Sequence, residues 1–93
     1  MTVGVLSIRL LIPGSHSLKD KRRALRSIKD RLRTGFNVSV AEVDCQDVWQ
    51  TAVLAVAAVG ADRGVVDGLL GKVSDLVRRN RQVEVVKCEK EFL

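Results

Sequence analysis

The chain is poor in aromatic residues, cysteine and histidine, and each shortage excludes a kind of site. Its 93 residues include no tyrosine, one tryptophan and two phenylalanines. Sheets that recognise RNA by stacking bases use several aromatic side chains, so that mode of binding is not expected. Cys45 and Cys88 form no CxxC pair, and His16 is the single histidine, so neither a zinc cluster nor a disulfide framework is encoded. We expect free thiols, no metal and no cofactor.

The sequence also lacks a long apolar run. No segment approaches the roughly 18 apolar residues that a membrane span requires, and no cationic stretch precedes the apolar segment Thr2 to Ile12. These absences predict a soluble, cytoplasmic protein without a membrane partner. A length of 93 residues, 46% of them hydrophobic, suits one compact core, so we expect residues 1–93 to form a single domain.

Positive charge is concentrated in one segment. Residues 19–33 carry eight cations and two anions, whereas the remainder of the chain carries eight cations and nine anions. The formal net charge of +5 therefore comes from this segment alone. Clustered lysine and arginine side chains raise the local potential and attract anionic partners, of which nucleic acid is the commonest in the cytoplasm.

Residue periodicity predicts a strand and then a helix in the first third of the chain. Thr2 to Ile12 alternates as a strand and is followed by a short polar turn. Ser17, followed three residues later by Asp20, resembles a capping box that starts a helix at Leu18. Gly35 is expected to stop this helix. Its apolar stripe consists of Leu18, Leu25, Ile28 and Leu32.

The rest of the chain predicts two strands, a helix and a strand. Phe36 to Val43 and Trp49 to Val59 are read as strands joined by a short polar link, although the alanines of the second run also favour a helix. Asp62 is expected to cap a second amphipathic helix that ends near Asn80. Gln82 to Lys90 predicts the last strand.

The order strand, helix, strand, strand, helix, strand is typical of the ferredoxin-like α+β fold. In this fold two β-α-β halves form a four-stranded antiparallel sheet with both helices on one face. Right-handed crossovers place the first and third strands at the centre of the sheet. The other face of the sheet is then left without helices.

Three segments of the sequence are similar to the bacterial YlxP family, a family of unknown function. They are Ser17 to Arg23 (SLKDKRR), Phe36 to Glu42 (FNVSVAE) and Asp47 to Gln50 (DVWQ). The similarity extends from Val3 to about Gly60, and the last third of the chain is similar only in pattern. The resemblance implies a small ferredoxin-like protein whose genes often lie beside translation-initiation and ribosome-maturation genes. It implies no catalytic residues.

Cations on the first predicted helix form the main candidate site. Four of them, at spacings of 4, 3 and 4 residues, make one row beside the apolar stripe: Arg22, Arg26, Lys29 and Arg33. Such a row can follow a phosphate backbone and release its counterions without reading sequence. The alternative is a solvated face, partly neutralised by Asp30. The full set of expected nucleic-acid contacts is Lys19, Arg22, Arg23, Arg26, Lys29 and Arg33.

Three further candidates also have a purely structural explanation. Gly14, Ser15 and Ser17 precede the positive end of the first helix and form a weaker candidate for anion binding, although Ser17 as a cap satisfies the same donors. His16 has no identifiable orienting carboxylate, so we expect a surface residue rather than a general base. Trp49 is interpreted as a core or sheet anchor rather than a base-stacking platform.

The first and third strands are apolar on both sides, which predicts an apolar patch on the bare face of the sheet. The residues expected in this patch are Val3, Val5, Val53, Ala55 and Ala57. We expect a homodimer closed through this face. The alternative is that the small alanines leave the patch too minor to matter.

No recognisable catalytic constellation is present, so we expect a protein that is not an enzyme. The favoured hypothesis is an RNA- or ribosome-associated accessory factor that contacts the phosphates of ribosomal RNA through the basic helix. A second is an acylphosphatase-like phosphohydrolase, because acylphosphatases share the fold and place a phosphate loop after the first strand. That loop needs an arginine, which the segment Gly14 to Ser17 lacks. A third is a regulatory ligand-binding module.

Overall fold

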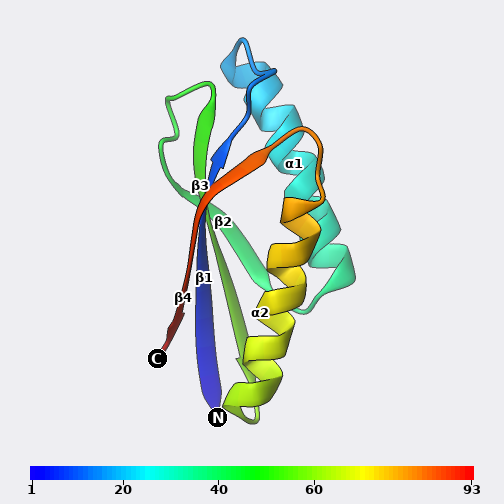
Figure 1. Ribbon diagram of the computed structural model, residues 1–93, viewed down its shortest axis with the longest axis vertical. Coiled ribbons are helices and arrows are strands. Elements are labelled where there is room, and N and C mark those ends of the chain that lie inside the picture. The colour runs from blue at the N-terminus through cyan, green and yellow to red at the C-terminus, as the bar shows by residue number, and fades with distance from the viewer.

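A computed structural model describes all 93 residues and has the six expected elements. They are β1 (Thr2–Leu11), α1 (Leu18–Gly35), β2 (Ser39–Asp44), β3 (Thr51–Gly60), α2 (Arg63–Arg78) and β4 (Glu84–Phe92). All strand pairs are antiparallel, and the order across the sheet is β2-β3-β1-β4, with the first and third strands central as predicted. Both helices lie on the same side of the sheet (Figure 1). The ferredoxin-like α+β prediction is confirmed.

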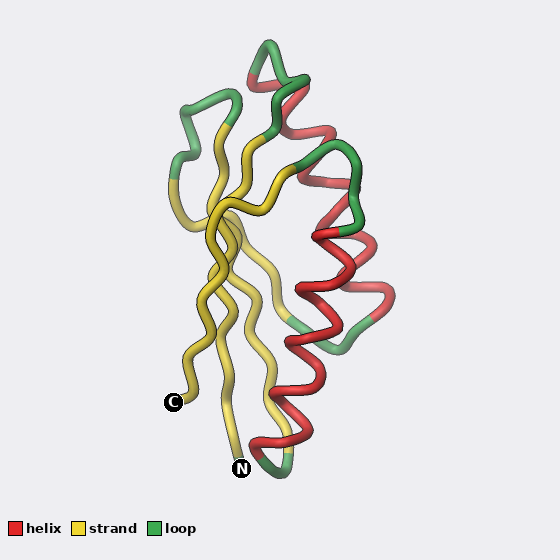
Figure 2. Tube along the Cα trace, in the orientation of Figure 1, coloured by secondary structure: helices red, strands yellow, loops and turns green.

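The strand boundaries differ from the sequence prediction in two places that matter for the site. β2 begins at Ser39 rather than Phe36, because Phe36 is the extended C-cap of α1 and packs against the core. β3 begins at Thr51 rather than Trp49, because residues 45–50 form a loop between β2 and β3 (Figure 2). β4 begins and ends two residues later than predicted.

Each helix begins where its capping residue places it. Ser17 Oγ accepts a hydrogen bond from Asp20 N at 3.1 Å, and His16 N donates to Asp20 Oδ2 at 3.0 Å. The two side chains thus satisfy backbone donors near the start of α1. Asp62 Oδ1 accepts from Val65 N at 3.0 Å in the same way at the start of α2. Both predicted N-caps are confirmed.

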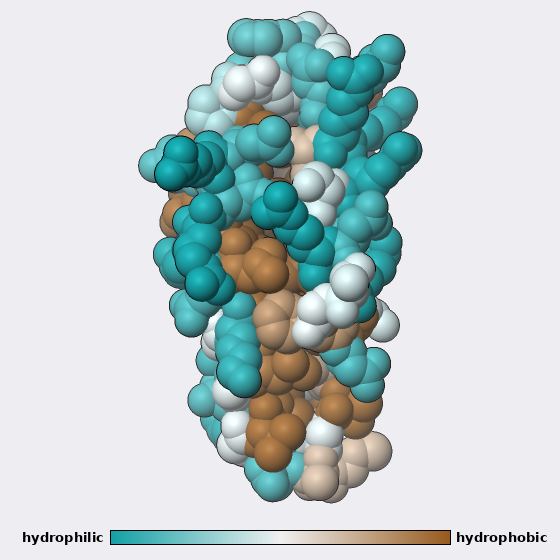
Figure 3. All heavy atoms as spheres, turned by 90° about the vertical axis from the view of Figure 1, so that its right-hand side faces the viewer, coloured by the Kyte–Doolittle hydropathy of each residue, from teal (hydrophilic) through white to brown (hydrophobic).

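The hydrophobic core lies between the sheet and the two helices. Its largest fully buried apolar side chains are Leu6, Ile8, Leu10, Ile28, Leu32, Leu54 and Leu70. Figure 3 views the helical layer and shows hydrophilic side chains over the upper half, where α1 begins, and apolar side chains gathered lower down, towards the start of α2. Neither helix has the length and hydropathy that a membrane crossing requires.

Gly4 allows α2 to pack closely on the central strand β1. A Cβ atom at this position would lie 2.6 Å from Val66 Cγ1 and 2.9 Å from Leu70 Cδ1, both closer than carbon atoms approach in proteins. On the outer side of α2 the situation is reversed, because a Cβ at Gly68 or Gly71 would meet nothing within 4 Å. These two glycines therefore lie opposite the packed side of the helix.

Candidate nucleic-acid interface

Packing of α1 on the sheet determines where its cations lie. Leu25, Ile28 and Leu32 are buried against the core, so the side chains between them must point along the flanks or outwards. Arg22, Arg26 and Arg33 are exposed, and Lys29 is half-buried. All four cations of the predicted row are therefore at least partly exposed to solvent along α1.

These four cations line one groove between α1 and the edge strand β2, which we call the basic groove. The groove has a volume of about 420 Å³. Its lining residues are Arg22, Leu25, Arg26, Lys29, Asp30, Arg33 and Glu42. The structure thus brings the predicted row together and adds a carboxylate from β2 that the sequence did not associate with it.

None of the four cations in the basic groove forms an ion pair. The three ion pairs of the chain are Lys21 with Glu42, Lys87 with Glu89, and Lys90 with Asp67. Asp30 makes none, so the neutralisation by Asp30 that the sequence allowed is not a direct contact. Arg33 Nη2 donates to the Val40 carbonyl at 2.9 Å, which fixes one end of the row against β2. The groove therefore keeps a net positive charge.

Two other predicted contacts lie apart from this groove. Arg23 lines a second groove with Gly14, Ser15 and Asp20, which we call the turn groove, and Arg81 from the segment between α2 and β4 joins them. The turn groove has a volume of about 500 Å³. Lys19 is exposed in the first turn of α1. The six predicted cations therefore belong to more than one surface.

The turn before α1 uses its polar groups internally. Ser17 Oγ and the Asp20 carboxylate are occupied by the capping contacts, and Ser15, which is buried, donates from Oγ to the Ser17 carbonyl at 3.0 Å. The Asp20 carboxylate also places a negative charge in the turn groove. These contacts favour the capping role of Ser17, and anion binding by Gly14, Ser15 and Ser17 stays a prediction. His16 is exposed, as expected.

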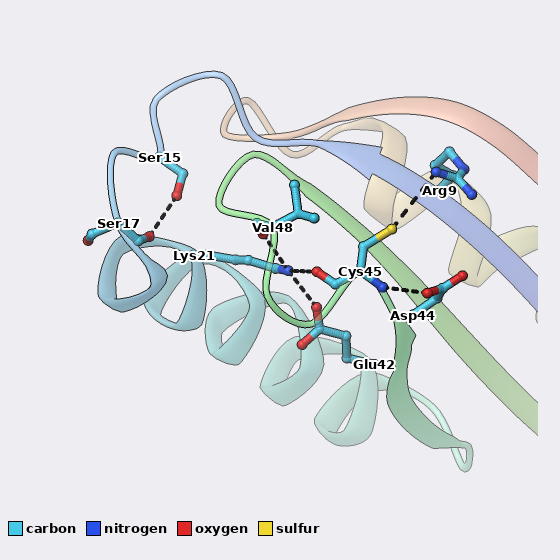
Figure 4. A network of polar contacts seen from close by, with 8 residues as sticks. All are labelled: Arg9, Ser15, Ser17, Lys21, Glu42, Asp44, Cys45 and Val48. Atoms are coloured by element: carbon cyan, nitrogen blue, oxygen red, sulfur yellow. Dashed lines mark hydrogen bonds and ion pairs between the residues drawn. The ribbon is translucent and has the colours of Figure 1, made fainter.

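Lys21 is the residue of this site that sequence reasoning missed. Its side chain is only 2% exposed, and its Nζ lies 2.6 Å from the Cys45 carbonyl, 2.7 Å from the Val48 carbonyl and 2.8 Å from Glu42 Oε2 (Figure 4). An ammonium group has three donors, and here three oxygen atoms surround it. Glu42 Oε2 is buried and has no other partner, so the pair is held by charge.

The position of Lys21 in the helix explains its burial. The apolar stripe of α1 runs through Leu18, Leu25, Ile28 and Leu32, and Lys21 fills the gap in a spacing of 3, 4, 3 and 4 residues. A side chain at this position must point at the sheet side of the helix. This spacing was the signal in the sequence that Lys21 faces the sheet. Lysine is almost never fully buried unless it is paired, so the sequence alone favoured placing Lys21 at the surface.

The loop between β2 and β3 (residues 45–50) is fixed by Lys21 at two of its carbonyls. The loop includes Cys45 at φ 61°, a left-handed conformation that is unusual for a residue other than glycine. Asp44 Oδ1 accepts from Cys45 N at 2.7 Å and supports this turn. At the other end of the loop, Ile12 N donates to the Gln50 carbonyl at 2.8 Å. The loop is therefore held at both ends against the start of α1 and the end of β1.

Trp49 lies in this loop, and its interpretation as a core or sheet anchor is wrong. Its side chain is 53% exposed, because β3 begins only at Thr51 and the loop carries the indole outside the sheet. Val48 beside it is also exposed. The strand prediction failed here because only Gln50 and Thr51 separate Trp49 from the apolar run of β3, too short a polar segment to mark a boundary.

The bare face of the sheet carries the patch predicted for a dimer. Val3 pairs with Val59 and Val5 with Ala57 across the two central strands, so their side chains form a continuous apolar surface. Val53 contributes little to it, because its side chain is only 8% exposed. Val59, the partner of Val3, is exposed there. On β4 the patch is bordered by Lys87, Glu89 and Glu91.

No group of three or more histidine, cysteine, aspartate or glutamate side chains comes together in the positions that a metal ion requires. Both cysteines are free and half-buried. Cys45 lies in the loop, where Arg9 Nη1 approaches its Sγ at 4.0 Å. Cys88 Sγ lies 3.8 Å from Ser74 Oγ beside the core.

Fold and site together define a small ferredoxin-like α+β protein with a cationic groove along its first helix. The chain belongs to the family described as "Protein of unknown function (DUF503)", whose model matches residues 3–90. It is 38% identical over 61 residues to the uncharacterized protein YlxP of Bacillus subtilis (strain 168), and the aligned segment covers 66% of this chain and 66% of that relative. The resemblance to the YlxP family is confirmed.

Proposed function

We propose that the chain is a cytoplasmic, non-enzymatic accessory factor that binds the phosphate backbone of RNA, with ribosomal RNA as the candidate partner, through the basic groove. The observation that carries the proposal is that four cations from one helix line one groove and none of them is paired with an acid. Unpaired arginine and lysine side chains on a rigid element are the groups that contact phosphates in nucleic-acid complexes.

The geometry of α1 suits an extended polyanion better than a single phosphate. At 1.5 Å per residue, Arg22 and Arg33 are separated by about 16 Å along the helix axis, which is the length of several nucleotides. Buried leucines and isoleucine on the adjacent face of α1 hold the helix against the sheet. The helix therefore does not have to become ordered when RNA binds, and the entropy cost of binding is small. The contacts are to charge and not to base edges, so we expect weak sequence preference.

Salt dependence provides the direct test. We expect binding of a fluorescently labelled ribosomal-RNA fragment to weaken as potassium chloride is raised, with a slope of about −3 in a plot of log K against log salt if all four cations contact phosphates of a single strand. Replacing Arg22, Arg26 and Lys29 with glutamate should abolish binding at moderate salt. Arg33 is left unchanged in this variant because it bonds the Val40 carbonyl.

A matched control variant tests whether binding depends on the cations of the basic groove or on the net charge of the chain. Replacing Lys72, Arg78 and Arg79 with glutamate changes the net charge equally at exposed positions outside the basic groove, and none of the three is in an ion pair. This control should keep most of the affinity, and thermal unfolding should show that both variants are folded. Equal loss of binding in both variants, or no binding by the native chain at low salt, would contradict the proposal.

The turn groove supports a second candidate function, a regulatory module for a small phosphorylated ligand. Arg23 and Arg81 come from two separate elements to line this groove, and neither is in an ion pair. Opposing this candidate, Asp20 lines the same groove. A set of phosphorylated metabolites screened by thermal unfolding would test it, since a ligand that binds only the folded chain raises the unfolding temperature. An acyl-phosphate hydrolysis assay would test for the acylphosphatase-like alternative.

We also propose that two copies of the chain associate through the bare face of the sheet. The apolar pairs Val3 with Val59 and Val5 with Ala57 lie at one end of the two central strands, and Arg9 and charged residues of β4 lie further along the same face. An apolar patch beside polar and charged groups is typical of protein interfaces. The basic groove lies on the helical side of the sheet, so a dimer of this kind would leave both grooves open.

A further inference from the structure

We infer that Trp49 is a stacking platform for an unpaired nucleobase, placed beside the basic groove. The inference rests on the proposed function and adds a ligand class to it, namely single-stranded rather than double-stranded RNA. Trp49 is 53% exposed, whereas Phe36 and Phe92, the other aromatic residues, are partly buried against the core. Trp49 is not among the side chains that pack against the core, so part of its indole is open to a ligand.

The backbone on both sides of Trp49 is immobilised. The carbonyl of Val48 accepts from the buried ammonium of Lys21 at 2.7 Å. On the other side, the Gln50 carbonyl accepts from Ile12 N at 2.8 Å, and Gln50 Nε2 donates to the Ser15 carbonyl at 3.0 Å. A loop held in this way presents the indole without having to order itself first, and an ordered aromatic group loses little entropy on binding.

The loop and the basic groove are connected through Lys21 and Glu42. Glu42 lines the basic groove, and its carboxylate is held 2.8 Å from Lys21 Nζ. The same Nζ holds the Val48 carbonyl (Figure 4), and Val48 directly precedes Trp49 in the chain. Arg22 of the groove follows Lys21 in α1. One ammonium group at the start of α1 therefore ties the loop that carries Trp49 to the glutamate that lines the basic groove.

The loop and the basic groove differ in charge, so we expect them to contact different parts of a nucleotide. The loop region carries Asp44 and Asp47, both exposed, which disfavour a phosphate on the loop itself. A nucleobase is uncharged and has a flat aromatic face, so it fits the indole, while the phosphates next to it fit the cations of α1. In a duplex the bases are already stacked on one another, so only an unpaired base can use the indole.

The single tryptophan makes the test direct, because no other tryptophan or tyrosine contributes to the emission. We would titrate the native chain with an unlabelled single-stranded oligoribonucleotide of about 12 nucleotides and with the same sequence annealed as a duplex. Stacking should quench the tryptophan fluorescence with the single strand and not with the duplex. The single strand should also bind more tightly than the duplex at equal salt.

Variants of Trp49 separate stacking from charge. Trp49→Ala should weaken single-strand binding about tenfold and leave duplex binding unchanged, and Trp49→Phe should keep most of the affinity. The slope of log K against log salt should be the same in Trp49→Ala as in the native chain, because stacking releases no counterions. Replacing Arg22, Arg26 and Lys29 with glutamate should instead abolish binding of both RNAs.

The outcomes distinguish this inference from the proposed function. The inference is overturned if the single strand does not quench the tryptophan fluorescence of the native chain and if Trp49→Ala binds the single strand as tightly as the native chain does. Phosphate binding through the basic groove would still stand in that case. Tryptophan is also common at the centre of protein interfaces, and that result would direct attention to a protein partner. If the native chain binds neither RNA at low salt, both proposals fail. An unfolding temperature equal to that of the native chain would show that Trp49→Ala is folded.

Discussion

The ammonium of Lys21 lies 2.8 Å from the carboxylate of Glu42 while only 2% of the lysine side chain is exposed. Removing one partner of a buried pair leaves a charge without compensation, at a cost of about 3–5 kcal/mol. We therefore expect Lys21→Met to lower the free energy of unfolding by this amount in a urea titration. Arg22→Met, one residue further on the exposed side, should change it by less than about 0.5 kcal/mol.

Combining Lys21→Met with Glu42→Gln should recover only part of this loss. The second change removes the unpaired carboxylate, but the carbonyls of Cys45 and Val48 still lose the donor that holds them. The loop at residues 45–50 should then exchange its amide protons faster than the native loop does. Lys21→Met with native stability would show that the pair has no structural importance.

Two glycine substitutions should have opposite effects on stability. Gly4→Ala places a Cβ 2.6 Å from Val66 Cγ1 and should destabilise the fold by about 1–3 kcal/mol, because α2 must move away from β1. Gly68→Ala meets nothing within 4 Å on the outer side of α2 and should stabilise it by up to about 1 kcal/mol. Thermal unfolding of both variants measures the contrast, and two changes of the same sign would refute it.

The cap of α1 should be replaceable by another capping side chain. Ser17→Ala removes the oxygen that accepts from Asp20 N at 3.1 Å and should cost about 1 kcal/mol. Ser17→Asp keeps an acceptor at the same position and should retain nearly native stability. Urea unfolding of the three chains tests this order, and equal stability of the alanine and aspartate variants would contradict the capping role.

Self-association through the bare sheet face should be sensitive to charge at its centre. We expect the native chain to sediment as a dimer at micromolar concentration and Val5→Glu to sediment as a monomer, because the change buries a carboxylate opposite Ala57. Val65→Glu makes the same chemical change at an exposed position on α2 and should leave the dimer intact. A monomeric native chain, or a dimer in both variants, would exclude this interface.

Much of the fold was predictable because local signals agree with one another. Ser17 and Asp62 are caps in both the sequence pattern and the structure, and the alternation of β1 continues through ten residues. The sheet order follows from the handedness of the two crossovers. The positions of Arg22 and Arg26 in one groove followed from helical spacing alone, because neighbours on a helix face stay neighbours in any fold.

The loop could not be predicted because its shape is determined by a contact distant in sequence. Lys21 bonds carbonyls 24 and 27 residues away, and no periodicity records such a pairing. Without that contact the run from Trp49 onwards reads as the start of a strand. The split of the cations into two grooves also depends on tertiary structure, since Arg81 reaches the turn groove from the far end of the chain.

The hydrogen bond from Arg33 to the Val40 carbonyl has a consequence for the solubility of the chain. β2 is an edge strand, and edge strands with free main-chain groups can add strands from other molecules and grow into fibres. Arg33 of α1 bonds a main-chain acceptor of this strand and adds a positive charge beside it. Loss of this side chain would therefore leave the edge of the sheet less protected against pairing with another molecule.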